Sequence, residues 1–362
     1  MGFACGIVGL PNVGKSTLFN ALTNAGASAQ PFPFCTIDAN VGVVPVPDPR
    51  LEQLSAIVKP HRTTPTSLTF VDIAGLIHGA SHGEGLGNRF LAHIREVDAI
   101  AHVVRCFEDE NIAHVSGSVN PKRDIEVINT ELILADLETV DRTQMKLAKL
   151  AKAGDKEARN TVEFLHWLSP LLNEGTVVRS MQLDPVQLEV LQSISLLTSK
   201  PIFYVANVAE QEPDNDFVSE VRKLASEENA ECVVICSVLE EELQTLSPAD
   251  RAEYLKELEI SETGLDKVVR TGYSLLHLHH FFTTNDNEVR AWTIPVGTKT
   301  IKAAGKVHSD FERGFIRAEV ISHADFISSK GEQGAKSAGK MRLEGKDYVV
   351  ADGDVIYFRF NV

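Results

Sequence analysis

A phosphate-binding pattern stands near the start of the chain. Residues 9–16 read GLPNVGKS and fit G-x-x-x-x-G-K-[ST], between an apolar strand-like run and a helical stretch. In this pattern Gly9 and Gly14 let backbone N–H groups surround phosphate oxygens at a helix N-terminus. Lys15 can reach the β- and γ-phosphates, and the Ser16 hydroxyl is a ligand for Mg²⁺. The strand–loop–helix context favours a nucleotide site over a glycine turn that carries a surface lysine. The other candidate nucleotide-binding residues of this loop are Asn12, Val13 and Thr17.

A second pattern, DIAG at residues 72–75, follows the next apolar run. The carboxylate of Asp72 could hold the metal ion through water, and the N–H of Gly75 could sense the γ-phosphate. Between the two patterns, Thr36 is a candidate to bring a hydroxyl to Mg²⁺, although a loop threonine is often only a turn residue. D-x-x-G alone is common by chance, but its place after a phosphate loop and a strand indicates function.

The stretch FYVANVAE, residues 203–210, is close to the guanine-reading sequence Asn-Lys-x-Asp without matching it. In that sequence the Asp carboxylate accepts two hydrogen bonds from guanine, and the Lys stem packs along the base. Val208 removes the stem and Glu210 is one methylene longer than Asp, so we predict lost guanine specificity, which permits ATP. The Asn207 amide could pair with N7 and the amino group of adenine. Glu210 as a solvated loop carboxylate is the alternative, and Ser237 is a further nucleotide-binding candidate.

The residue after DIAG is Leu76, where many GTPases place a water-orienting Gln. An alkyl side chain cannot orient water, so either another group does so or turnover is slow without a partner. The candidates are His78, His82 and His114. We favour His114, because its polar loop follows a strand and so lies near the ligand end of the sheet, although most loop histidines are solvated bystanders. The predicted catalytic residues are therefore Lys15, Gly75 and His114.

These residues need a sheet to position them. Apolar runs flanked by Gly alternate with helical stretches up to about residue 110, which predicts an α/β fold with a mostly parallel sheet. Strand patterns then stop, and Ile125, Ile128 and Leu132 recur at helical spacing. The predicted nucleotide-binding domain is thus split over residues 1–122 and 200–277. Residues 123–199 form an inserted helical hairpin, either a structural insertion or a docking arm.

Charge separates the C-terminal part from the rest. The net charge is −15, yet residues 278–362 hold 12 basic and 11 acidic side chains. Short β runs and Gly turns there predict a small β-rich domain. Its segment 330–346 carries five basic side chains, either a solvated face or a patch that contacts rRNA phosphates. These are Lys330, Lys336, Lys340, Arg342 and Lys346.

The location can also be predicted from the sequence. The chain starts without a secretory signal, no apolar run is long enough to span a membrane, and five cysteines lack zinc-type spacing. We therefore expect a cytoplasmic protein with reduced thiols, and neither membrane nor DNA as partner.

The whole combination resembles the Obg/YchF branch of the P-loop GTPase family, and most closely its YchF subfamily of Obg-like ATPases. The resemblance rests on GLPNVGKSTLFNALT, PFCTID, DIAGL, GEGLGNRFL and the C-terminal GKDYVVADGDVI. That last stretch resembles a TGS domain, a ubiquitin-like β-grasp module. The resemblance implies a P-loop domain with an inserted helical arm and a C-terminal β-grasp domain, a preference for ATP, and association with ribosomes. A GTP-specific switch, or a nucleotide-binding scaffold with little hydrolysis, remain alternatives.

Overall fold

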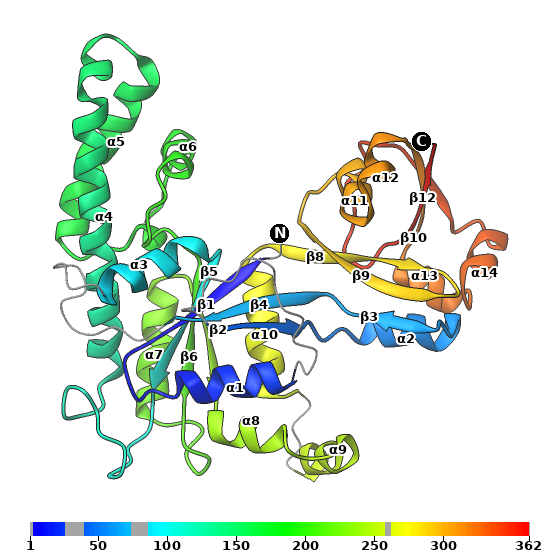
Figure 1. The fold of residues 1–362 in the computed structure, drawn as a ribbon, viewed down its shortest axis with the longest axis horizontal. Coiled ribbons are helices and arrows are strands. Elements are labelled where there is room, and N and C mark those ends of the chain that lie inside the picture. The colour runs from blue at the N-terminus through cyan, green and yellow to red at the C-terminus, as the bar shows by residue number, and fades with distance from the viewer. Residues whose placement is uncertain (1–2, 26–39, 74–85, 258–261, 362) are drawn as a thin grey trace. The chain divides into compact units, whose positions relative to one another are not determined.

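The structure is a computed structural model that describes residues 3–25, 40–73, 86–257 and 262–361 (Figure 1). Within these ranges, no helix combines the length and apolar character needed to cross a bilayer. The chain divides into two compact units, Met1–Val43 with Thr69–Gly272 and Val44–Leu68 with Tyr273–Val362.

The first unit is built on a six-stranded sheet in the order β2-β4-β1-β5-β6-β7. β1 pairs in parallel with β4 and β5, and β6 pairs in parallel with β5 and β7. Every residue of β5 and β6 is buried, as expected for central strands of a parallel sheet covered on both faces. The bounds are β1 Ala4–Val8, β2 Asn40–Pro45, β4 Ser67–Asp72, β5 Ala99–Arg105, β6 Ile202–Asn207 and β7 Glu231–Ile235. The predicted α/β sheet domain is confirmed.

Helices connect these strands, and α1 packs beside α8 while α7 packs beside α4. Figure 1 shows α1 and α10 on one side of the sheet and α3 and α7 on the other. The bounds are α1 Lys15–Ala25, α3 Leu86–Glu96, α7 Asp216–Glu227, α8 Ser237–Leu243, α9 Pro248–Glu257 and α10 Gly264–Leu275.

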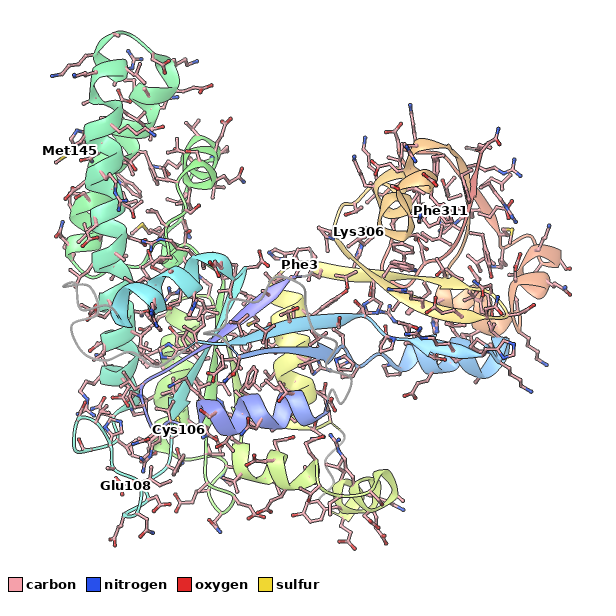
Figure 2. The ribbon with its side chains drawn as sticks, viewed as in Figure 1. Phe3, Cys106, Glu108, Met145, Lys306 and Phe311 are labelled. Atoms are coloured by element: carbon pink, nitrogen blue, oxygen red, sulfur yellow. The ribbon has the colours of Figure 1, made fainter. Side chains whose placement is uncertain are left out.

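The inserted segment folds as helices that pack on one another. α4 (Pro121–Lys152) and α5 (Lys156–Asn173) lie side by side, followed by a 3-10 helix at Val178–Ser180 and by α6 (Pro185–Ser193) (Figure 1). Side-chain caps fix their N-termini, because Asn120, Asp155 and Asp184 each accept a hydrogen bond from a first-turn N–H. Met145 lies on the outside of α4, with 79% of its surface exposed (Figure 2).

A buried carboxylate holds the end of the inserted segment against α4. Asp136 of α4 accepts hydrogen bonds from the N–H groups of Leu197 and Thr198, at 2.6 and 2.8 Å, and from the Thr198 hydroxyl at 2.6 Å. Burial raises the pKa of Asp136, and these hydrogen bonds oppose that effect. The segment that leads into β6 is thereby held against α4.

The second unit contains another six-stranded sheet, in the order β11-β10-β12-β8-β9-β3. β8 pairs antiparallel with β9 and parallel with β12, and β10 pairs antiparallel with β11 and β12. Its strands are β3 Arg62–Thr64, β8 Leu278–Thr284, β9 Glu288–Pro295, β10 Phe315–Ile321, β11 Arg342–Glu344 and β12 Val355–Phe360. Its helices are α2 Pro49–Val58, α11 Thr300–Val307, α12 Ser309–Arg313, α13 His323–Ser328 and α14 Glu332–Ser337. The predicted C-terminal β-rich domain is confirmed.

Residues 44–68, which the sequence analysis assigns to the nucleotide-binding domain, belong instead to this second unit. Leu51 and Leu54 of α2 share an apolar core with Phe282 and Val289, and β3 adds a parallel edge strand to β9. α2 therefore contributes to the hydrophobic core of the C-terminal domain.

Charged side chains also connect residues 44–68 to the rest of the second unit. The Arg50 guanidinium donates to Asp48 at 3.0 Å and to Asp352 at 2.9 Å, and His280 contacts Asp48. Burial alone would raise the pKa of Asp48, but hydrogen bonds from His280 and Arg50 outweigh it and hold the pKa well below its usual range.

Candidate nucleotide-binding site

Predicted residues that the structure describes lie at one edge of the first sheet. In the strand register Asp72 lies opposite Ile7, and Asn207 lies between Arg105 and Ile235. Because these strands are parallel, their carboxyl ends face the same edge, the usual ligand side of an open α/β sheet. The loop of residues 9–14 leaves β1 at this edge and leads directly into α1.

Two glycines of this loop have no room for a side chain. Gly14 has φ +98°, and a Cβ there would lie 2.2 Å from Nδ2 of Asn207. A Cβ at Gly9 would lie 2.5 Å from the carbonyl oxygen of Val103. The glycine pattern is therefore required by how closely this loop approaches β5 and β6.

Lys15 is folded back onto the loop. Its ammonium group donates to the carbonyls of Gly9 at 2.8 Å and Leu10 at 2.7 Å, and only 9% of the residue is exposed. Burial lowers its pKa to about 8, partly opposed by the Asp72 carboxylate. A phosphate oxygen at this place would give the buried ammonium the counter-charge that the carbonyls do not provide.

Asn207 connects the phosphate loop to the end of β7. Its side-chain amide donates to the carbonyl of Val13 at 2.9 Å and accepts from the N–H of Ser237 at 3.0 Å. Only 4% of the residue is exposed. From the sequence we predict that this amide could pair with adenine, but in the structure both its nitrogen and its oxygen already have backbone partners. Its observed role is to position the loop.

The residues after Asn207 border a cavity. Val208 is buried, and its N–H continues the ladder to the carbonyl of Ile235. Glu210 is exposed, and both residues line a cavity of about 540 Å³ beside α8 and α10. The Lys stem of a guanine-reading sequence is thus replaced by a buried alkyl group.

Ser237 leaves an unpaired group close to the loop. The residue is buried, and its hydroxyl has no hydrogen-bond partner among the described residues. That oxygen would lie 3.8 Å from a Cβ at Gly14, so it borders the phosphate loop. An orphaned hydroxyl at this position fits a polar ligand that completes the site.

Ser16 and Thr17 form the first turn of α1, whose first N–H groups have no intrahelical acceptor. The Ser16 side chain is exposed, and Asp72 at the end of β4 is close enough to affect the pKa of Lys15. A hydroxyl and a carboxylate are hard oxygen ligands, so this pair fits the requirements of Mg²⁺.

His114 has another role than the predicted one. Its Nε2 lies 2.9 Å from a carboxylate oxygen of Asp124 at the start of α4, and its Nδ1 accepts from the N–H of Ser116. The imidazole side chain is almost fully buried. Because both ring nitrogens are engaged, His114 fixes its loop to α4 and is not available to orient a water molecule.

Arg105, which the sequence analysis did not single out, organises the loop after β5. Its buried guanidinium donates to the carbonyls of Phe107, Asp109 and Ile112. The side chain of Asn12 in turn donates to the carbonyl of Ala113, in the same loop, at 3.1 Å. In the sequence, Arg105 is visible only as an arginine at the end of an apolar strand. That position does not indicate which groups its guanidinium binds.

His102 on β5 is a second residue that the sequence analysis passed over. It is almost fully buried, its ring lies 5.4 Å from that of Tyr204, and its Nδ1 has no partner among the described residues. Burial lowers its pKa to about 3, and the charges of Arg179 and Lys15 act in the same direction. This imidazole is therefore neutral at physiological pH.

Several predicted residues lie outside the described ranges. They are Thr36, Gly75, Leu76, His78 and His82. The basic segment 330–346 is described, and two of its cations already have acidic partners. Lys340 pairs with Asp325 at 3.4 Å, and Arg342 pairs with Asp354 at 3.4 Å. If this segment contacts rRNA, as one of the two predictions has it, the contact would depend chiefly on Lys330, Lys336 and Lys346.

The phosphate loop, its lysine and the parallel sheet define a P-loop nucleotide hydrolase of the GTPase fold. Residues 4–159 match the family described as 50S ribosome-binding GTPase, and residues 278–361 match the YchF GTPase C-terminal family, described as a protein of unknown function.

Curated relatives cover the full length. The chain is 57% identical to the ribosome-binding ATPase YchF of Escherichia coli O157:H7 and 54% identical to that of Bacillus subtilis (strain 168), with all of each chain aligned. The structure also resembles the Schizosaccharomyces pombe YchF GTPase, with TM-score 0.89 and 36% identity over 99% of this chain and 98% of that one. The chain belongs to the YchF family.

Proposed function

We propose that this chain is a cytoplasmic, Mg²⁺-dependent ATPase that binds ribosomes. The observation that carries the nucleotide assignment is the segment 207–210, where a buried valine and an exposed glutamate replace the Lys and Asp that read guanine. The names of its relatives, ribosome-binding ATPases at 57 and 54% identity, support the same activity and partner.

The preference for ATP follows from what guanine would lose. A guanine-specific site pairs the N1 and N2 hydrogens of the base with one carboxylate, and a displaced acceptor leaves those donors unpaired at a cost of about 1–3 kcal/mol. Val208 adds an apolar surface that makes no distinction between the two bases. These residues therefore do not exclude adenine. Asn207 positions the phosphate loop whichever base is bound.

The chain's own residues bind and orient the triphosphate. Backbone N–H groups of the loop and of the first turn of α1 surround the β- and γ-phosphates, with Lys15 leaving its carbonyl partners to meet them. Ser16 and Asp72 would hold Mg²⁺, which when bound neutralises charge on these phosphates. Since His114 is engaged elsewhere, we expect slow hydrolysis unless a partner orients the water.

Calorimetry with ATP and GTP on nucleotide-free protein tests the choice of base. We expect ATP to bind at least tenfold more tightly, about 1.4 kcal/mol. The double variant Val208→Lys/Glu210→Asp should shift preference towards GTP by a similar factor, whereas Val208→Leu should not. Tighter GTP binding by the unaltered chain would favour a GTP-specific switch and contradict the proposal.

Multiple-turnover phosphate release, measured with and without ribosomes, tests hydrolysis and partner together. We expect co-sedimentation with ribosomes and a faster rate in their presence. A chain that binds nucleotide but shows no turnover under either condition would be a scaffold rather than an ATPase.

A further inference from the structure

A second cavity, of about 590 Å³, lies in the first unit away from the nucleotide residues. It is bordered by α3 and by residues 135–146 of α4, and these two helices lie close together in Figure 1. Leu91 of α3 and Ala135 of α4, both buried, contribute to its base. A volume in this range suits a small molecule.

The lining of this cavity is unusually basic for a chain of net charge −15. Arg95 of α3 and Arg142 and Lys146 of α4 line it, with Glu138 as the single acidic residue. Arg142 and Lys146 are four residues apart, as are Glu138 and Arg142, so all three lie on one face of the helix.

These three cations make no ion pair with any carboxylate of the described residues, although Lys122 and Glu126 of the same helix do pair. Arg142 has Glu138 at the correct spacing and still does not bind it. Arg95 acts on Asp136 only at a distance, because the carboxylate of Asp136 is occupied by Leu197 and Thr198. The lining therefore holds three cations against one carboxylate, and the described residues form no ion pair between them.

Hydroxyl groups complete the lining. Thr139 and Thr143 each donate to the carbonyl four residues earlier, at 3.0 and 2.7 Å, so their hydroxyl hydrogens are already used and they offer an anion no further donor. Ser195 is exposed and has no hydrogen bond among the described residues, so its hydroxyl can donate. Arginine forks, an ammonium and hydroxyls are the groups that bind phosphate and carboxylate oxygens.

We propose that this cavity is a binding site for a small polyanion, a phosphorylated or polycarboxylate metabolite, held by Arg95, Arg142 and Lys146. The cations come from two helices that line one hollow, which favours a compact ligand over an RNA backbone. The ligand would bridge α3, which follows the DIAG segment, and α4, which forms the arm. Its binding would thus link the nucleotide domain to the arm. This site is independent of the proposed ATPase activity.

The test uses the full chain saturated with ADP, so that the phosphate loop is already occupied. Inorganic pyrophosphate and citrate are titrated by calorimetry, which separates the phosphate and carboxylate sources. We expect saturable binding that weakens with salt, and a loss of at least about tenfold in Arg142→Gln/Lys146→Gln. The control Lys149→Gln/Lys152→Gln removes the same charge from the same helix beyond the cavity and should change affinity less than about twofold.

Thermal unfolding verifies that each variant is folded, and Arg95→Gln, on the other helix, provides a second variant with the same expected loss. Absence of saturable binding by both probes would overturn the proposal. So would an equal loss in the control pair, which would indicate general charge attraction. Binding of a short single-stranded RNA that depends on Arg142 and Lys146, without binding of either small anion, would assign the surface to RNA and also overturn it.

Discussion

At the scale of single residues, Asn207 has the clearest consequence. Asn207→Ala leaves the Val13 carbonyl and the Ser237 N–H without their partner, in a region that is almost fully buried. An unsatisfied buried group costs about 1–3 kcal/mol, so ATP affinity should fall by about tenfold or more. Calorimetry measures this loss, with Asn20→Ala on the exposed side of α1 as the control. An unchanged affinity would mean that the loop does not need this connection.

The pKa of Lys15 allows a prediction of how ATP affinity depends on pH. In the free chain burial lowers its pKa to about 8, and a bound triphosphate raises it, so the complex holds more protons than the free chain above about pH 8. Affinity should therefore decrease as pH rises through about 8 and be level at lower pH, where Lys15 is protonated in both states. Calorimetry in buffers of different ionisation enthalpy should detect proton uptake. Lys15→Arg, which stays charged, should abolish that uptake.

The roles of single residues could be predicted from the sequence where the chemistry of the ligand alone determines them. Gly14, Lys15 and Ser16 follow from phosphate chemistry. The partners of His114 and Asn207 could not be predicted, because they depend on which buried groups the fold places opposite them. From the sequence, a histidine in a polar loop looks free to bind a water molecule. Only the structure shows that Asp124 on α4 binds the imidazole of His114.

At the scale of elements, the arm depends on Asp136. Asp136→Ala leaves the N–H groups of Leu197 and Thr198 unpaired within the fold, and we expect a loss of about 2–4 kcal/mol in the free energy of unfolding. Asp136→Asn keeps one acceptor and should lose less. Chemical denaturation checks both, against Asp141→Ala at an exposed position of the same helix. Equal effects at residues 136 and 141 would show that the carboxylate has no special role.

The elements of the first unit were predictable because their periodicity is strong. The inserted helices follow from the helical spacing of Ile125 to Leu132, and their caps are side chains that a sequence displays directly. The sheet order and the position of α3 beside α4 do not follow, since they depend on contacts between segments far apart in the chain.

At the scale of the whole molecule, residues 44–68 belong to a unit whose other residues begin more than 200 positions later. The local sequence of α2 does not distinguish it from a helix of the nucleotide domain. Its amphipathic pattern indicates that one face packs against other residues, but it does not identify those residues. Leu54 is fully buried in the core that includes Phe282 and Val289. A truncation in that core costs about 2–5 kcal/mol.

Leu54→Ala should therefore destabilise the second unit while leaving the affinity of the first unit for nucleotide unchanged. Calorimetric unfolding should contain a transition that ATP raises, since the ligand binds only the folded first unit, and a second transition that Leu54→Ala lowers. Leu22→Ala, equally buried in α1, is the matched control and should lower the first transition instead. If Leu54→Ala lowered the first transition as much as Leu22→Ala does, the two units would unfold as one. The segment 44–68 would then act as a cooperative link between them rather than as part of the second core alone.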